Sequence, residues 1–155
     1  MERTSRLTRR QVLALFAAAM ATGLPLGAPQ AGPRDAKKHL AELTGGTKPQ
    51  KVKGKIKITL PKVTDQGDFI PLRVAVDSPM TDSDHVTAIH VVAERNPSPA
   101  VASFRFGPRS GRAEVSTRIR LVKTQVIQVA AEMNDGSVFL AKARCKVSTG
   151  AGGCG

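Results

Sequence analysis

The two cysteines of this 155-residue chain are its residues best suited to covalent chemistry. Residues 148–155 contain four glycines. Glycine has no side chain to bury and loses the most backbone freedom on ordering, so we expect this segment to form a flexible, solvated arm. A thiol on such an arm has no fixed base or pocket beside it, and it is suited to carrying a group to other proteins rather than to catalysis. The carrying residue would be Cys154, and the glycines of the arm are Gly150, Gly152, Gly153 and Gly155.

The arm is long enough to present the thiol away from the folded domain. Val147 is the last residue of the apolar pattern before it, and seven extended residues from there to Cys154 reach about 23 Å. Glycines on both sides leave the sulfur slim enough to enter a narrow channel. No neighbouring group favours the thiolate, so we expect a partner enzyme to activate it.

The second thiol, Cys145, falls in a segment of period two. Phe139, Ala141, Ala143, Cys145 and Val147 share one face of an expected strand, and the intervening residues are mostly basic. This alternation favours a buried core position for Cys145. A disulfide between Cys145 and Cys154 is the alternative, because an oxidising compartment would permit it and the arm could fold back.

Other candidate residues have simpler structural interpretations. His39, His85 and His90 do not share a metal-ligand spacing with the cysteines, so we expect no metal site. Asp82 and Asp84 lie in a polar turn that side-chain capping explains. An alternating segment is typical of a solvated strand face, with a partner or anion contact as the less favoured interpretation; its members are Arg112, Glu114, Ser116, Arg118 and Arg120.

The N-terminus indicates export. Arg9 and Arg10 precede an apolar run that is too short to span a bilayer, in the form of a twin-arginine signal peptide. We expect residues 1–31 to be cleaved, residues 32–147 to form one domain, and the product to be periplasmic and free of the membrane. The 20 basic and 11 acidic residues from Gly32 onward leave a charge of +9, which suits anionic substrates or acidic partners. Export and the lack of Trp and Tyr argue against nucleic acid.

The remaining pattern predicts an all-β fold. A short amphipathic helix is expected over residues 35–43, with Asp35 as its N-cap. Short strands follow, separated by Pro, Gly, Asn and Asp clusters, and Asn134, Asp135 and Gly136 predict a tight hairpin between the last two. We therefore expect an immunoglobulin-like antiparallel β-sandwich. Its seven strands are placed at 52–60, 69–76, 85–94, 100–106, 112–121, 125–133 and 138–147.

These features together resemble the SoxY family, the sulfur-carrier proteins of bacterial thiosulfate oxidation. The likeness rests on the export signal and on residues 77–81 (DSPMT), 110–120 (SGRAEVSTRIR), 132–137 (EMNDGS) and 152–155 (GGCG). Two features depart from the family pattern. One glycine rather than two follows Cys154, and Cys145 is an additional thiol.

The resemblance implies a carrier that is not itself an enzyme and holds no cofactor other than a covalent sulfur adduct on Cys154. It implies a heterodimer with SoxZ and transient contacts with three enzymes. SoxXA would join thiosulfate to Cys154, SoxB would release sulfate, and SoxCD would oxidise the remaining sulfur. The alternative function is an exported immunoglobulin-like protein whose two thiols form a redox switch or bind a soft metal.

Overall fold

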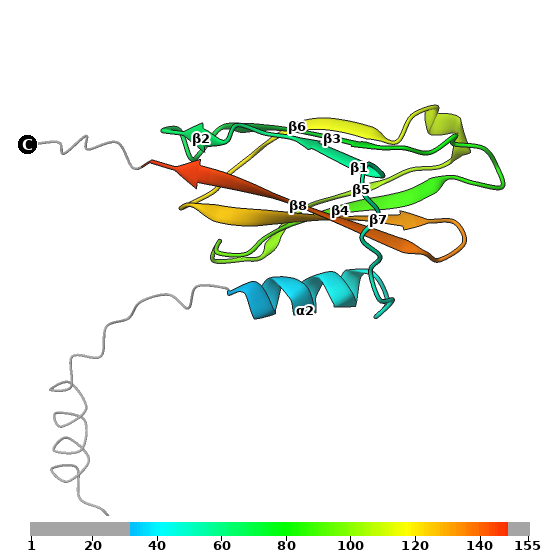
Figure 1. Ribbon diagram of the computed structural model, residues 1–155, viewed down its shortest axis with the longest axis horizontal. Coiled ribbons are helices and arrows are strands. Elements are labelled where there is room, and N and C mark those ends of the chain that lie inside the picture. Colours follow the sequence, from blue (N-terminus) through cyan, green and yellow to red (C-terminus); the bar gives the residue numbers. More distant parts are fainter. Residues whose placement is uncertain (1–31, 149–155) are drawn as a thin grey trace, which may run out of the picture.

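The computed structural model describes residues 32–148, which form two β-sheets and one helix (Figure 1). A three-stranded sheet has the order β1-β3-β6, and a five-stranded sheet has the order β2-β8-β7-β4-β5. The strands are β1 (Ile56–Thr59), β2 (Val63–Thr64), β3 (Ile70–Val76), β4 (Val86–Ala93), β5 (Ala100–Arg105), β6 (Glu114–Ile119), β7 (Gln125–Met133) and β8 (Val138–Val147). A 3-10 turn, η1 (Pro108–Ser110), precedes β6.

The main core lies between the two sheets, as the alternation of apolar residues predicts. In β3 every second residue is buried, so Ile70, Leu72 and Val74 point inward. They meet Ile89, Val91, Ile127 and Val129 from the five-stranded sheet. This facing pair of apolar surfaces confirms an all-β sandwich.

A third layer explains why β4 and β7 are buried on both faces. The helix α2 (Pro33–Leu43) lies against the outer face of the five-stranded sheet (Figure 1). Ala36 and Leu40 of α2 pack with Val92, Ala130 and Val138 in a second apolar cluster. Pairing of β4 with β7 shifts register between Val86 and Ala88, and Val86 lies in the main core together with Ile89 and Val91.

The predicted hairpin is present. β7 and β8 pair antiparallel from Gln125 opposite Cys145 to Glu132 opposite Val138. Gly136 has a φ of 80°, the left-handed region that glycine enters without strain. Its N–H donates to the carbonyl of Met133 at 3.0 Å. The tight turn therefore directs β8 back along β7.

Three details of the sequence prediction were wrong. The strand expected from residue 52 begins at Ile56, because residues 53–55 form a turn in which Gly54 has a φ of 87°. The strand β2 was missed, and it pairs with β8 in parallel. The helix begins at Pro33 with Gly32 as its N-cap, and the Asp35 carboxylate instead accepts a hydrogen bond from the Gly32 N–H at 2.7 Å. Within residues 32–148, the helix is too short to cross a membrane.

Candidate functional site

The predicted site, Cys154 with Gly150, Gly152, Gly153 and Gly155, lies outside the described residues. The signal peptide expected over residues 1–31 lies outside them as well. The structure does describe the end of β8, which leads into residues 149–155. We call Val147 and Ser148 the arm root.

The arm root is held on one side by β2 and the loop around it. The Ser148 N–H donates to the carbonyl of Thr64 at 2.9 Å, and the Ser148 hydroxyl donates to the same oxygen at 3.2 Å. Two residues earlier along β8, the Lys146 N–H donates to the carbonyl of Lys62 at 2.8 Å. These bonds keep the last described residue in strand register with β2.

Thr124 holds the arm root from the other side. Its hydroxyl accepts a hydrogen bond from the Val147 N–H at 3.0 Å and donates to the Val147 carbonyl at 3.2 Å. Gly67 also lies close to the arm root. A β-carbon at that position would be 2.6 Å from the carbonyl oxygen of Leu121 and 3.3 Å from Cγ1 of Val147. The point from which residues 149–155 continue is therefore fixed by residues that the sequence reasoning did not single out.

Cys145 is a free thiol with no exposed surface, at the end of β8 inside the main core. The predicted inward orientation is confirmed. Burial raises the pKa of this thiol, because the charged thiolate is poorly stabilised away from water. Cys145 is therefore kept in its unreactive neutral form.

The histidines have structural partners. His90 Nδ1 lies 2.8 Å from the hydroxyl of Ser103, and its Nε2 lies 3.3 Å from Glu132. His39 lies 3.7 Å from Glu42, and His85 Nδ1 lies 2.9 Å from the carbonyl of Thr81. In the described part of the chain, no three His, Cys, Asp or Glu side chains converge into a metal-binding group.

The polar turn and the arginine-rich strand have the expected structural roles. Thr81 caps the turn, because its hydroxyl accepts a hydrogen bond from the Asp84 N–H at 3.1 Å. In β6 and the residue after it, Glu114 pairs with Arg73 and Arg120 pairs with Asp68. The hydrogen bond from Arg73 holds the pKa of Glu114 below its usual value.

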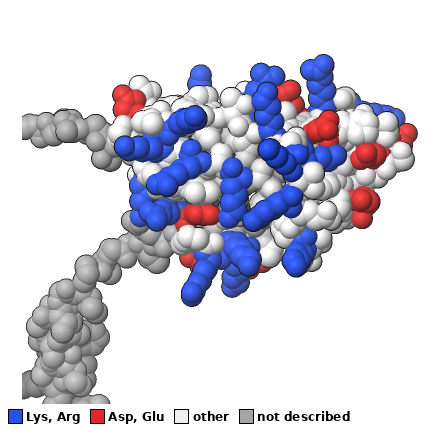
Figure 2. All heavy atoms as spheres, in the orientation of Figure 1, with Lys and Arg blue, Asp and Glu red and all other residues white. Residues whose placement is uncertain are grey.

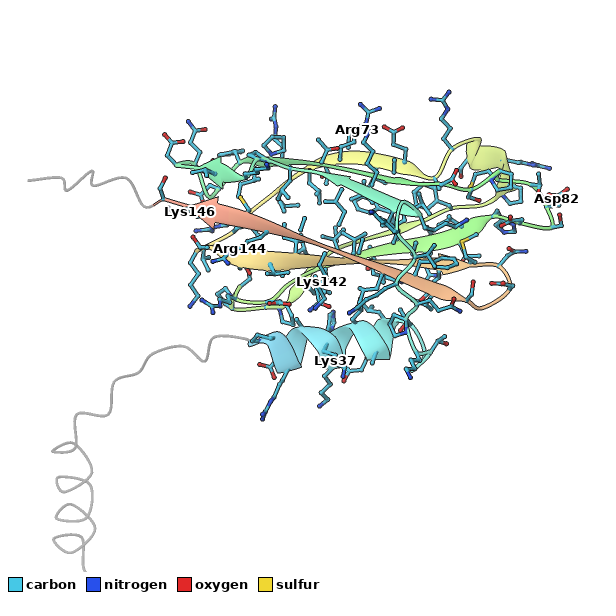
Figure 3. All side chains as sticks on the ribbon, viewed as in Figure 1. Lys37, Arg73, Asp82, Lys142, Arg144 and Lys146 are labelled. Carbon is cyan, nitrogen blue, oxygen red and sulfur yellow. The ribbon has the colours of Figure 1, made fainter. Side chains whose placement is uncertain are left out.

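Basic side chains crowd the side of the sandwich where β8 is the long outer strand, the face in view in Figure 2. Lys142, Arg144 and Lys146 alternate along β8, and Lys142 lies between β8 and α2 in Figure 3. Lys142 is 3.6 Å from Glu94. In this view the acidic side chains lie mostly toward the right-hand end, and few stand among the basic ones at the left.

Comparison with known protein families identifies the family of this chain. Residues 40–154 match the family described as "Sulfur oxidation protein SoxY". The chain belongs to the SoxY family. The matched range includes both Cys145 and Cys154. No curated protein matches this chain in sequence.

Solved structures agree with that placement. The chain is similar to the sulfur carrier protein SoxY from Chlorobium limicola f thiosulfatophilum, with 30% sequence identity and a TM-score of 0.63. That match covers 74% of this chain and 97% of the other. A superoxide reductase from Ignicoccus hospitalis matches at 19% identity and a TM-score of 0.55, over 61% of this chain and 80% of that one. At this identity the second likeness shows a shared fold and nothing about chemistry.

Proposed function

We propose that this protein is a covalent carrier of sulfur intermediates in thiosulfate oxidation, with the thiol of Cys154 as the attachment point. The observation that carries the proposal is the family match, which extends through Cys154. The buried and neutral state of Cys145 supports it, because a core thiol is poorly placed to meet an enzyme. The exposed reactive thiol would then be Cys154.

The chemistry begins with oxidative loading. The thiol of Cys154 loses its proton, a sulfur–sulfur bond forms to thiosulfate, and two electrons pass to an acceptor that we assign to the haem enzyme SoxXA. Water then attacks the terminal sulfonate group in the site of SoxB, and sulfate leaves while a persulfide remains on Cys154. SoxCD would oxidise that persulfide. The carrier performs none of these steps itself and needs no cofactor.

The rest of the proposal concerns how the thiol is presented. Residues 148–155 act as a flexible arm on an immunoglobulin-like domain, and SoxZ completes a heterodimer that leaves the arm accessible. The twin-arginine signal directs the protein to the periplasm. The hydrogen bonds at the arm root support this arrangement, because a fixed starting point restricts where the arm can reach.

Loading with purified partners tests the function. The protein with SoxZ is incubated with SoxXA, an electron acceptor and labelled thiosulfate, and label retained on the protein is measured. We expect Cys154→Ser to retain no label and Cys145→Ala to retain as much as the unaltered protein. Equal loading of Cys154→Ser would contradict the proposal. Loss of loading in both variants would instead support the redox-switch alternative.

A further inference from the structure

A groove runs between α2 and the outer face of β8. Its volume is about 710 Å³, within the range of known ligand-binding clefts. One wall is α2, the second is the loop over residues 46–51, and the floor comes from β7 and β8. The helix and the loop that follows it therefore meet β7 and β8, which are distant in sequence, around one concave surface.

The charges of the groove are unbalanced. Arg34 and Lys37 of α2 and Lys48 and Lys51 of the loop line it. None of these four cations has an ion-pair partner among residues 32–148. The single carboxylate in the lining, Glu94, is already engaged by Lys142 and by Gln128, whose amide donates to it at 2.7 Å. An anionic ligand would meet four cations that have no internal counter-charge.

The floor of the groove is apolar. Leu40 is almost fully buried between α2 and the sheet, and Leu140 is half-buried beside it on β8. Both belong to the cluster under the helix, and both line the groove. A ligand that carries only charged groups would leave this apolar surface exposed to water. A ligand with apolar groups among its charges would cover it.

The edge of β8 beside the groove is paired at both ends. Gln50 bridges β8 through two bonds, from the Gln50 N–H to the Val138 carbonyl at 2.7 Å and from the Leu140 N–H to the Gln50 carbonyl at 2.8 Å. Farther along the same edge, the Lys146 N–H donates a hydrogen bond to the Lys62 carbonyl. Alternate residues of a strand direct their backbone groups to the same side, so the amides of Lys142 and Arg144 face this edge.

Between the Gln50 bridge and β2, the chain passes through β1, which lies close to β8. An added strand would have to fit between Gln50 and β2, which already occupy this side of β8 at both ends of the stretch. The edge therefore offers no free length for a partner strand, and the groove is the open surface beside it.

We propose that the groove binds an acidic segment of a partner protein that also carries apolar side chains. Its carboxylates would face Lys37, Lys51 and the other groove cations, and its apolar side chains would cover Leu40 and Leu140. The proposal does not rest on Cys154, because every residue that defines the site lies between Pro33 and Lys142.

Other occupants fit less well. The lining contains no aromatic side chain on which a nucleic-acid base could stack. A membrane is a broad surface and would not enter a concave groove beside a helix. An inorganic oxyanion is much smaller than the groove and offers nothing to the apolar floor. A protein segment alone uses both the charge and the apolar floor.

The test uses a peptide in which glutamate and valine alternate, and a control peptide in which lysine replaces glutamate. Binding to the protein that carries Cys154→Ser is followed by fluorescence anisotropy and by amide chemical shifts. We expect the acidic peptide to bind and the basic peptide not to bind. Shifts should centre on the residues of α2, of the loop over residues 46–51 and of β8 that line the groove.

Matched variants separate the groove from general charge attraction. Lys37→Glu with Lys51→Glu should weaken the acidic peptide about tenfold or more, since two close contacts become repulsive. Lys57→Glu with Arg118→Glu changes the net charge equally at exposed positions on the three-stranded sheet, and it should weaken binding by less than about threefold.

Three results would overturn the proposal. Equal weakening by the two double variants would show that binding follows net charge only. Amide shifts centred on another face of the sandwich would place the binding site elsewhere. Displacement of the peptide by sulfate at low millimolar concentration and constant ionic strength would identify a small-anion site instead.

Discussion

At the scale of single residues, the thiol of Cys145 is closed off from water. Cys145 contributes a small apolar side chain to the core between the sheets, next to residues that the alternation of β8 also turns inward. The sequence predicted this position because every second residue of the segment is apolar. The partners of Cys145 in the core come from strands distant in sequence, and period-two alternation does not identify them.

Replacing Cys145 with alanine should lower stability and spare loading. The cavity left by the sulfur should cost about 1 kcal/mol in the free energy of unfolding at neutral pH. Chemical denaturation measures this cost, with Ser116→Ala at an exposed position of β6 as the control. No loss of stability, or rapid alkylation of Cys145 in the folded protein, would contradict its buried assignment.

The cost should also depend on pH. Burial raises the pKa of Cys145 in the folded state above the ordinary thiol value of about 8.5. The unfolded chain therefore releases this proton first as pH rises, and the stabilisation is complete below that value and falls above it. The difference in unfolding free energy between the unaltered protein and Cys145→Ala should shrink from pH 7 toward pH 10. A difference that grows over this interval would contradict the direction of the shift.

At the scale of elements, alternation located the long strands well and located short or irregular elements poorly. The strands β7 and β8 have the predicted bounds because apolar residues recur regularly up to a clear turn. β2 has two residues and pairs with a distant strand, so no local period reveals it. The groove was missed for a similar reason, since its cations come from α2, the loop over residues 46–51 and β8.

Close packing at the arm root gives a prediction for Gly67. In Gly67→Ala the new methyl group would collide with the backbone oxygen of Leu121 and press on Val147, at a cost of about 1–3 kcal/mol. Gly107→Ala is the matched control, because a β-carbon there meets nothing within 4 Å. Thermal unfolding compares the two. Equal melting temperatures for both variants would show that the arm root is not held as described.

The arm should be able to enter the processing enzymes because its glycines carry no bulky side chains. Replacing Gly152 and Gly153 with valine keeps the length and adds bulk, so turnover by the processing enzymes should fall while a small reagent alkylates Cys154 at an unchanged rate. Paired rates of turnover and alkylation measure this. Unchanged enzymatic turnover would mean that Cys154 is processed on an open surface rather than inside a channel.

At the scale of the whole molecule, exposed apolar residues gather near the arm root. Val63 lies on β2 opposite Lys146, and Val122 follows Leu121, whose N–H donates to the carbonyl of Gly67. Phe69 is 67% exposed two residues after Gly67. A large aromatic side chain left in water costs free energy that a partner surface would recover, which is consistent with a carrier completed by SoxZ.

Association with SoxZ should therefore depend on Phe69. Phe69→Ser should weaken the heterodimer without lowering the melting temperature of the isolated protein, because the side chain contributes little to its own core. Val52→Ser, also at an exposed apolar position, is the control. Sedimentation velocity with and without SoxZ gives the affinity. Equal affinities of both variants for SoxZ would show that the interface lies elsewhere on the sandwich.

The central claim is that Cys154 carries sulfur while Cys145 stays a free thiol in the core. Mass spectrometry under non-reducing conditions, on protein isolated from cells oxidising thiosulfate, tests it most directly. We predict added sulfur and oxygen on the C-terminal peptide that contains Cys154 and an unmodified Cys145. A loss of two hydrogens with a cross-link between Cys145 and Cys154, and no sulfur adduct, would contradict the carrier function.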